Sequence, residues 1–91
     1  MIERQANDVR VSGAVTIANA AAVSEAGKQE LNADITFDLA GVTEVDSTAL
    51  SVLFEWQRAA KEKKIKVSFR NLPDSMRSLA SLYGVADLVA A

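Results

Sequence analysis

Two segments of the chain carry apolar residues at every second position. Residues 35–39 place isoleucine, phenylalanine and leucine on one side, with Thr36 and Asp38 on the other. Residues 66–70 repeat this arrangement with a valine and a phenylalanine. A period of two is typical of a strand with one buried face. We therefore expect a strand in each segment.

The first residues predict an antiparallel hairpin. The runs 2–6 and 8–12 flank the turn-prone pair Asn7-Asp8, and the second run alternates apolar and polar residues. Asparagine and aspartate favour turns because their side chains hydrogen-bond to the nearby backbone. We expect the hairpin to close at Gly13.

An alanine-rich segment, residues 18–26, predicts the first helix. Alanine has the highest helix propensity, and the segment also contains Val23. Thr16 offers an N-cap ahead of it, and Gly27 follows it in the position where helices often end.

Two further helices are expected, at residues 47–63 and 76–83. No helix-breaking residue interrupts the longer one. The shorter one has Pro73 near its first turn and Gly84 just past its end, as capping preferences favour. The apolar tail, residues 85–91, is expected to pack back on the sheet.

The expected order is strand, strand, helix, strand, helix, strand, helix, with Gly41 and Thr43 in the connection to the second helix. Strands that alternate with helices imply parallel crossovers within one sheet. We predict a single α/β domain over residues 1–91. It has a small mixed β-sheet, with an N-terminal antiparallel hairpin and then parallel strands, and about three helices packed on it.

Composition narrows the possible functions. The net charge is −2 and the sequence pI is about 5.0, which argues against nucleic acid as the main partner. There is no cysteine, no signal peptide pattern at the N-terminus and no run of about 18 apolar residues. We expect a soluble protein that stays in the cytoplasm and does not insert into a membrane.

The residues also argue against catalysis. The chain has no histidine and no glycine-rich phosphate loop, so the commonest general base and a Ser-His-Asp arrangement are missing. Asp38 and Asp46 are an alternative: both are expected near the carboxyl end of the central strand, where they would hold Mg²⁺ if a further oxygen donor lay nearby. The preferred interpretation is a protein without catalytic residues, metal or cofactor.

The start of the long helix is rich in hydroxyl groups. Asp46 is expected to cap the helix, so the side chains of Ser47 and Thr48 remain for another role. Glutamate or glutamine does not follow three residues later, so a capping box is absent. The helix start also presents free N–H groups and the positive end of the helix dipole, which suit an acidic group or a phosphoserine.

A helical projection of residues 47–63 separates a core face from a polar stripe. One residue departs from this pattern: Phe54 projects on the polar side, near Ser47, Ser51 and Arg58. An aromatic residue and an arginine within a polar rim are typical of the centre of a protein interface. We predict a partner-binding patch formed by Ser47, Thr48, Ser51, Phe54 and Arg58.

Residues 37–50 resemble the signature of the STAS domain family: a strand, a short turn, then Asp-Ser or Asp-Thr at the start of a helix. Within that family, residues 53–60 and 79–88 are similar to the MlaB-like members, cytoplasmic subunits of the Mla phospholipid ABC transporter. The resemblance implies a non-enzymatic accessory subunit that binds the MlaF-like ATPase subunit and supports its assembly and activity. It would reach the membrane permease, and lie at the inner membrane, only through that complex. Ser47 occupies the position that is important for the contact.

The same resemblance implies an alternative. In anti-sigma factor antagonists of the family, the residue equivalent to Ser47 is phosphorylated by a partner serine kinase, and phosphorylation ends binding. Ser47 keeps the hydroxyl that such a switch needs. Many antagonists carry glycine two residues later, where this chain has Ala49, and this departure weakens the phosphorylation hypothesis.

Overall fold

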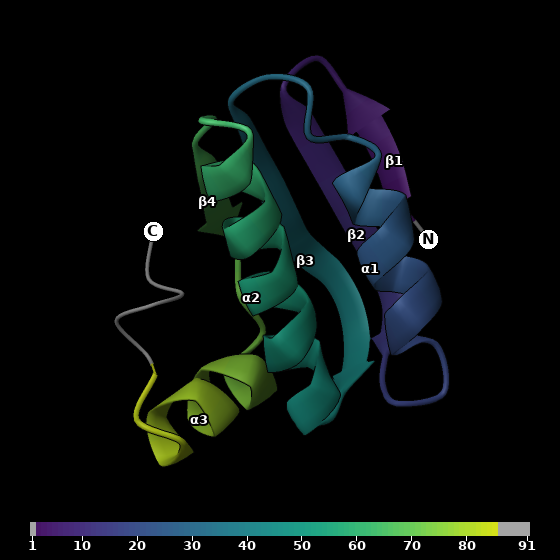
Figure 1. Ribbon diagram of the computed structural model, residues 1–91. Helices are drawn as coiled ribbons and strands as arrows, with labels where there is room; N and C mark the ends of the chain where they lie inside the picture. The colour runs from purple at the N-terminus through teal and green to yellow at the C-terminus, as the bar shows by residue number, and fades with distance from the viewer. Residues whose placement is uncertain (1, 86–91) are drawn as a thin grey trace.

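The described residues of this computed structural model, 2–85, form a four-stranded sheet with three helices (Figure 1). The sheet order is β1-β2-β3-β4; β1 pairs antiparallel with β2, and the other neighbours are parallel. This confirms the predicted α/β fold with its mixed sheet. The elements are β1 (Ile2–Gln5), β2 (Asp8–Val15), α1 (Ala20–Lys28), β3 (Ile35–Val45), α2 (Ser47–Glu62), β4 (Val67–Arg70) and α3 (Asp74–Leu82).

Helices α1 and α2 lie side by side against one face of the sheet, and α3 lies beside the start of α2 (Figure 1). Successive right-handed crossovers in one direction place their helices on the same face. Phe37 is at the centre of the core between them, stacked on Trp56 with ring centroids 4.0 Å apart, and 6.0 Å from Phe69. Both Phe37 and Trp56 are buried almost completely.

The opposite face of the sheet is polar. Glu3, Arg10, Asp38 and Arg70 occupy one row across the four strands, so the charge alternates from strand to strand. The Arg70 guanidinium lies 3.2 Å from the Asp38 carboxylate. Opposite charges on neighbouring strands stabilise a sheet. Because Glu3, Arg10 and Arg70 are exposed, this face is directed to solvent.

The first helix differs from the prediction at both ends. Gly27 lies inside α1, where an added Cβ would lie 2.3 Å from the Trp56 ring. The glycine therefore allows α1 and α2 to approach closely rather than ending the helix. Thr16 does not cap α1: the residue before the helix is Asn19, whose side chain instead donates to the Ala14 carbonyl at 2.8 Å.

Strands β2 and β3 are longer than expected. Gly41, predicted in the connection to α2, pairs with Ser12 of β2 inside β3, and β2 continues beyond Gly13. The pairing contains register shifts, which let both strands continue past irregular positions. A Cβ at Gly41 would approach Ser12 Cβ to 2.9 Å, so this close strand approach requires glycine. In the predicted tail, residues 86–91 lie outside the described residues.

Candidate partner-binding site

The side chain of Asp46 caps α2. Its Oδ1 accepts a hydrogen bond from the Thr48 backbone N–H at 2.9 Å and a second one from the Thr48 hydroxyl. Its Oδ2 accepts from the Ile17 backbone N–H at 3.0 Å. The bond from the Thr48 side chain, followed by the one from Ile17, holds the pKa of the Asp46 carboxyl below its usual value. Asp46 thus remains ionised and joins two segments distant in the sequence.

The hydroxyls of Ser47 and Thr48 differ in their contacts. The Thr48 hydroxyl donates to Asp46, whereas the Ser47 hydroxyl has no hydrogen-bond partner among residues 2–85. Ser47 is also exposed, at the first position of α2. Of these two hydroxyls, the one on Ser47 is therefore available to a partner or a modifying enzyme.

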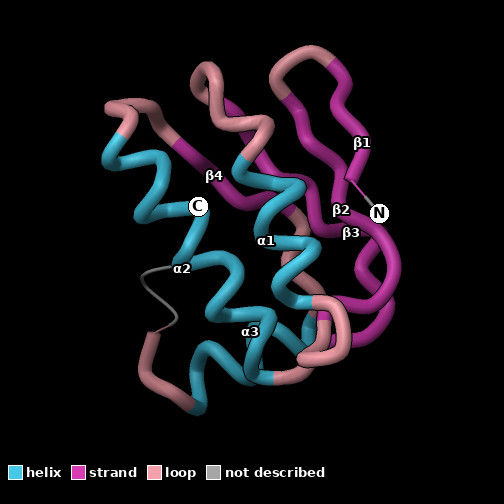
Figure 2. The backbone as a smooth tube through the Cα atoms, turned by 45° about the vertical axis from the view of Figure 1, so that its right-hand side comes forward, coloured by secondary structure: helices cyan, strands magenta, loops and turns pink. Residues whose placement is uncertain are grey.

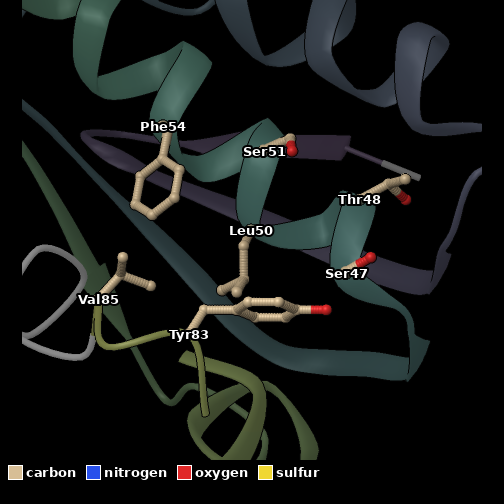
Figure 3. Close-up of a pocket in the computed structure, with 7 residues that line it drawn as sticks. All are labelled: Ser47, Thr48, Leu50, Ser51, Phe54, Tyr83 and Val85. Atoms are coloured by element: carbon tan, nitrogen blue, oxygen red, sulfur yellow. The ribbon is translucent and has the colours of Figure 1, made fainter. Parts of the chain in front are cut away.

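A pocket of about 360 Å³ opens between the first two turns of α2 and the end of α3 (Figure 3). Its lining combines apolar side chains with hydroxyl groups and contains no charged residue. Figure 3 shows the Tyr83 ring beside Leu50, with its hydroxyl directed toward the Ser47 end of the pocket. The lining residues are Ser47, Thr48, Leu50, Ser51, Phe54, Tyr83 and Val85.

Gly84 directs the chain so that residues on either side of it line the pocket. It has a φ of +71°, and its N–H donates to the Ser81 carbonyl. The next N–H, from Val85, donates to the Ala80 carbonyl at 2.8 Å. This pair of bonds is a Schellman motif, which satisfies the last carbonyls of a helix and reverses the chain. The glycine predicted just past the last helix is thus part of the site's geometry.

Four of the five predicted partner-binding residues lie together, since Ser47, Thr48, Ser51 and Phe54 all line the pocket. Arg58 does not. Its guanidinium pairs with Glu55 at 3.1 Å, and Glu55 also pairs with Lys28 of α1. Arg58 remains exposed and is not among the residues that line the pocket.

Phe54 is less exposed than the helical projection suggests. It is half-buried and packs against the edge of the core. Leu50 and two residues beyond α3, Tyr83 and Val85, line the pocket with it, which a projection of α2 alone does not reveal. The sequence carries only a weak signal for the latter two: they flank the glycine that ends α3.

The alternative metal site is contradicted by the geometry. Asp38 is the fourth residue of β3, and Asp46 follows the end of that strand. At about 3.3 Å per residue, eight residues of extended chain put the two roughly 26 Å apart along the strand. Asp38 instead accepts bonds from the Ala40 N–H and the Asn71 amide. In the described part of the chain, no group of three histidine, cysteine, aspartate or glutamate residues is arranged to hold a metal ion.

Comparison with solved structures identifies the fold. The unphosphorylated form of the anti-sigma factor antagonist SpoIIAA superposes with a TM-score of 0.75 at 10% identity, covering 98% of this chain and 84% of that one. A candidate anti-sigma factor antagonist from Thermotoga maritima superposes with a TM-score of 0.78 at 18% identity, covering 99% and 82%. A search of curated proteins finds no match. The chain therefore has the fold of these anti-sigma factor antagonists.

A comparison with protein families identifies the family to which the chain belongs. The family described as "Mlab, STAS domain" matches residues 1–90. The chain therefore belongs to the MlaB family of STAS domains, which confirms the resemblance found in the sequence. No helix within residues 2–85 has the length and apolar character needed to cross a bilayer.

Proposed function

We propose that this protein is a non-enzymatic accessory subunit that binds the cytoplasmic ATPase subunit of an Mla-type phospholipid ABC transporter. It docks through the pocket at the start of α2 and supports assembly and activity of the ATPase. The transporter's role would be to maintain lipid asymmetry of the outer membrane. Residues 1–91 act as one domain in this role. The protein is cytoplasmic and reaches the inner membrane and the permease through the ATPase.

The observation that carries this proposal is the convergence of Ser47, Thr48, Ser51 and Phe54 on one pocket in a chain of the MlaB family. The pocket shares with interface centres two aromatic residues and a lining without charged side chains. Its open shape, between two helices, suits side chains of a partner protein.

The contacts of Asp46, the carboxylate at the start of α2, support binding rather than catalysis. Asp46 accepts three hydrogen bonds, from the Ile17 N–H and from the N–H and hydroxyl of Thr48, so its carboxylate is engaged in holding the fold together. The chain also lacks histidine and cysteine, the side chains that most often transfer protons or attack substrates at neutral pH.

Binding of the purified ATPase subunit, measured by calorimetry, tests the proposal. Phe54→Ala is expected to raise Kd about tenfold or more, because aromatic residues at interface centres contribute strongly to affinity. Ser47→Ala is expected to raise it several-fold. The matched control is Ser68→Ala, an exposed serine on β4 at the polar face of the sheet. If wild-type protein does not bind the ATPase, or if both α2 variants bind as tightly as wild type while folded, the proposal is wrong.

A second candidate is an anti-sigma factor antagonist that is switched by phosphorylation of Ser47. The exposed hydroxyl of Ser47, which has no hydrogen-bond partner among residues 2–85, favours it. A phosphate there would add a charge of about −1.5 to −2 in a pocket with no charged lining residue, which would prevent an apolar partner from docking.

Incubation with a serine kinase encoded near this protein, followed by intact mass measurement, tests the second candidate. The expected result is one added phosphate on wild-type protein and none on Ser47→Ala. Ser68→Ala serves as the control and should still be phosphorylated. Wild-type protein without added phosphate would contradict the switch.

A further inference from the structure

The large hydrophobic residues exposed in the described chain gather at one end of the molecule. Ile17 is 79% exposed, Leu82 75% and Tyr83 58%. Ile17 lies in the loop between β2 and α1, and the other two lie at the end of α3. Figures 1 and 2 place this loop, the start of α2 and α3 at the same end. A single exposed apolar residue is ordinary. Here such residues lie at the end of the molecule that also holds the largely apolar pocket.

The loop that carries Ile17 is held against the start of α2. The Ile17 N–H donates to Asp46 Oδ2 at 3.0 Å, while Oδ1 of the same carboxylate caps the helix. Within the loop, the Thr16 N–H donates to the Asn19 side chain at 3.0 Å. Ile17 is thus fixed on one side of the helix start, and the pocket with Tyr83 lies on the other side.

The electrostatics of this end indicate the chemistry of its occupant. The pocket lining contains no charged side chain. Asp46 lies between the pocket and the Ile17 loop, and both of its oxygens already accept hydrogen bonds. A charged group in the pocket would lose water without gaining an opposite charge, which is unfavourable. An uncharged apolar segment would meet no such cost.

We propose that the docking surface extends from the pocket across the start of α2 to Ile17, and that it takes an uncharged apolar segment of the ATPase subunit. One apolar side chain of that segment enters the pocket beside Phe54 and Tyr83, and another covers Ile17. Asp46 is a positioning residue that sets the distance between these two contacts. This inference rests on the proposed function, because it specifies which part of the ATPase binds and how.

Calorimetry with the full chain and the purified ATPase subunit tests the extended surface. Ile17→Ser should raise Kd about tenfold, since it removes a buried apolar contact. The control Lys61→Ser lies about 21 Å along α2 from Ser47 and should leave Kd unchanged. Wild-type Kd should change less than about threefold between 0.05 and 0.5 M NaCl, because the contact is uncharged.

The outcomes separate this inference from the proposed function. If wild type binds and Ile17→Ser binds equally well, the extended surface is wrong while the function stands. A strong loss of affinity in salt would identify a charged segment and overturn the inference in the same way. No binding by wild type would overturn the function and the inference together.

The positioning role has its own test, which needs no partner. In Asp46→Asn the amide oxygen still caps the helix through Thr48, but its NH₂ group cannot accept from the Ile17 N–H. Hydrogen exchange at the Ile17 amide should accelerate at least about tenfold, with exchange at the Thr48 amide and the helix content retained. Unchanged exchange at Ile17 would show that Asp46 does not position the loop.

Discussion

At the scale of single residues, two aspartates have roles set by their hydrogen bonds. Asp46 joins the start of α2 to the loop that carries Ile17. Asp38 is buried on the polar face of the sheet, where it accepts bonds from the Ala40 N–H and Asn71 and lies beside Arg70. The bond from Ala40, followed by the one from Asn71, holds the Asp38 pKa below its usual value. Both carboxylates therefore stabilise the fold in their ionised form.

These lowered pKa values predict loss of stability in acid. An unfolded aspartate has a pKa of about 3.9, so as the pH falls the unfolded chain binds these protons before the folded one does. The stabilisation is complete well above pH 4 and is lost as the pH falls through the lower folded values. We expect urea denaturation to give a smaller free energy of unfolding at pH 3 than at pH 6.

Replacement of one carboxylate provides the control for this acid effect. Asp38→Asn should lower the free energy of unfolding at pH 6 by about 1 kcal/mol, because its neutral side chain is a weaker acceptor. It should also reduce the difference between pH 6 and pH 3. Glu62→Gln, at the exposed end of α2, should leave that difference unchanged. An equal acid effect in Asp38→Asn and wild type would contradict the role of Asp38.

At the scale of secondary structure elements, glycines determine how closely segments approach and where they turn. Gly27 lets α1 contact the Trp56 ring of α2, and Gly41 lets β3 approach β2. Gly84 has a different role, because open space surrounds its missing Cβ and only its positive φ requires glycine. The Gly84 turn brings Tyr83 and Val85 to the pocket, so the end of α3 contributes to its lining.

Substitution of Gly84 tests this role. Gly84→Val should lower the free energy of unfolding by about 1–2 kcal/mol, since a β-branched residue is strained at positive φ. It should also weaken ATPase binding by displacing Tyr83. Gly84→Asn is the matched control, because asparagine tolerates this conformation and should largely preserve stability and affinity. Thermal melts and calorimetry measure both effects; equal results for the two variants would contradict the role of the turn.

At the scale of the whole molecule, the two faces of the sheet differ in character. The helices bury one face, while the other carries the row of alternating charges that includes Arg10 and Asp38. The exposed large apolar residues lie instead at the end of the molecule that holds the start of α2. This distribution separates the charged sheet face from the end of the molecule where we propose that the partner docks.

A substitution on the polar face tests that separation. Arg10→Ser should leave the Kd for the ATPase subunit within about twofold of wild type, because Arg10 lies on the sheet face opposite the helices. Ile17→Ser is the matched comparison, because it also replaces an exposed residue by serine. It should weaken binding in the same assay. Loss of affinity in Arg10→Ser would show that the partner contacts the polar face of the sheet and would contradict the proposed docking surface.

Local signals in the sequence were sufficient for the order of elements, the Asp46 cap and the Gly84 turn. Each depends on interactions within a few residues, such as the bond from the Thr48 N–H to Asp46. The amphipathic pattern of α2 likewise identified four residues that now line one pocket. The family resemblance followed from a contiguous stretch, residues 37–50.

Tertiary structure alone decided the features that join distant segments. The local sequence around Gly27 is typical of a helix end. The residue is instead needed because the Trp56 ring, far along the chain, packs against it. Arg58, predicted in the partner-binding patch, is not among the residues that line the pocket and pairs with Glu55. Ile17 contacts Asp46, and Tyr83 lines the pocket beside the start of α2, through contacts that no local pattern encodes. By itself the sequence determined the order of the elements, the cap at the start of α2 and the glycine turn after α3, since capping and periodicity are short-range. The ends of α1, β2 and β3, and which side chains share a surface, depended on packing between elements.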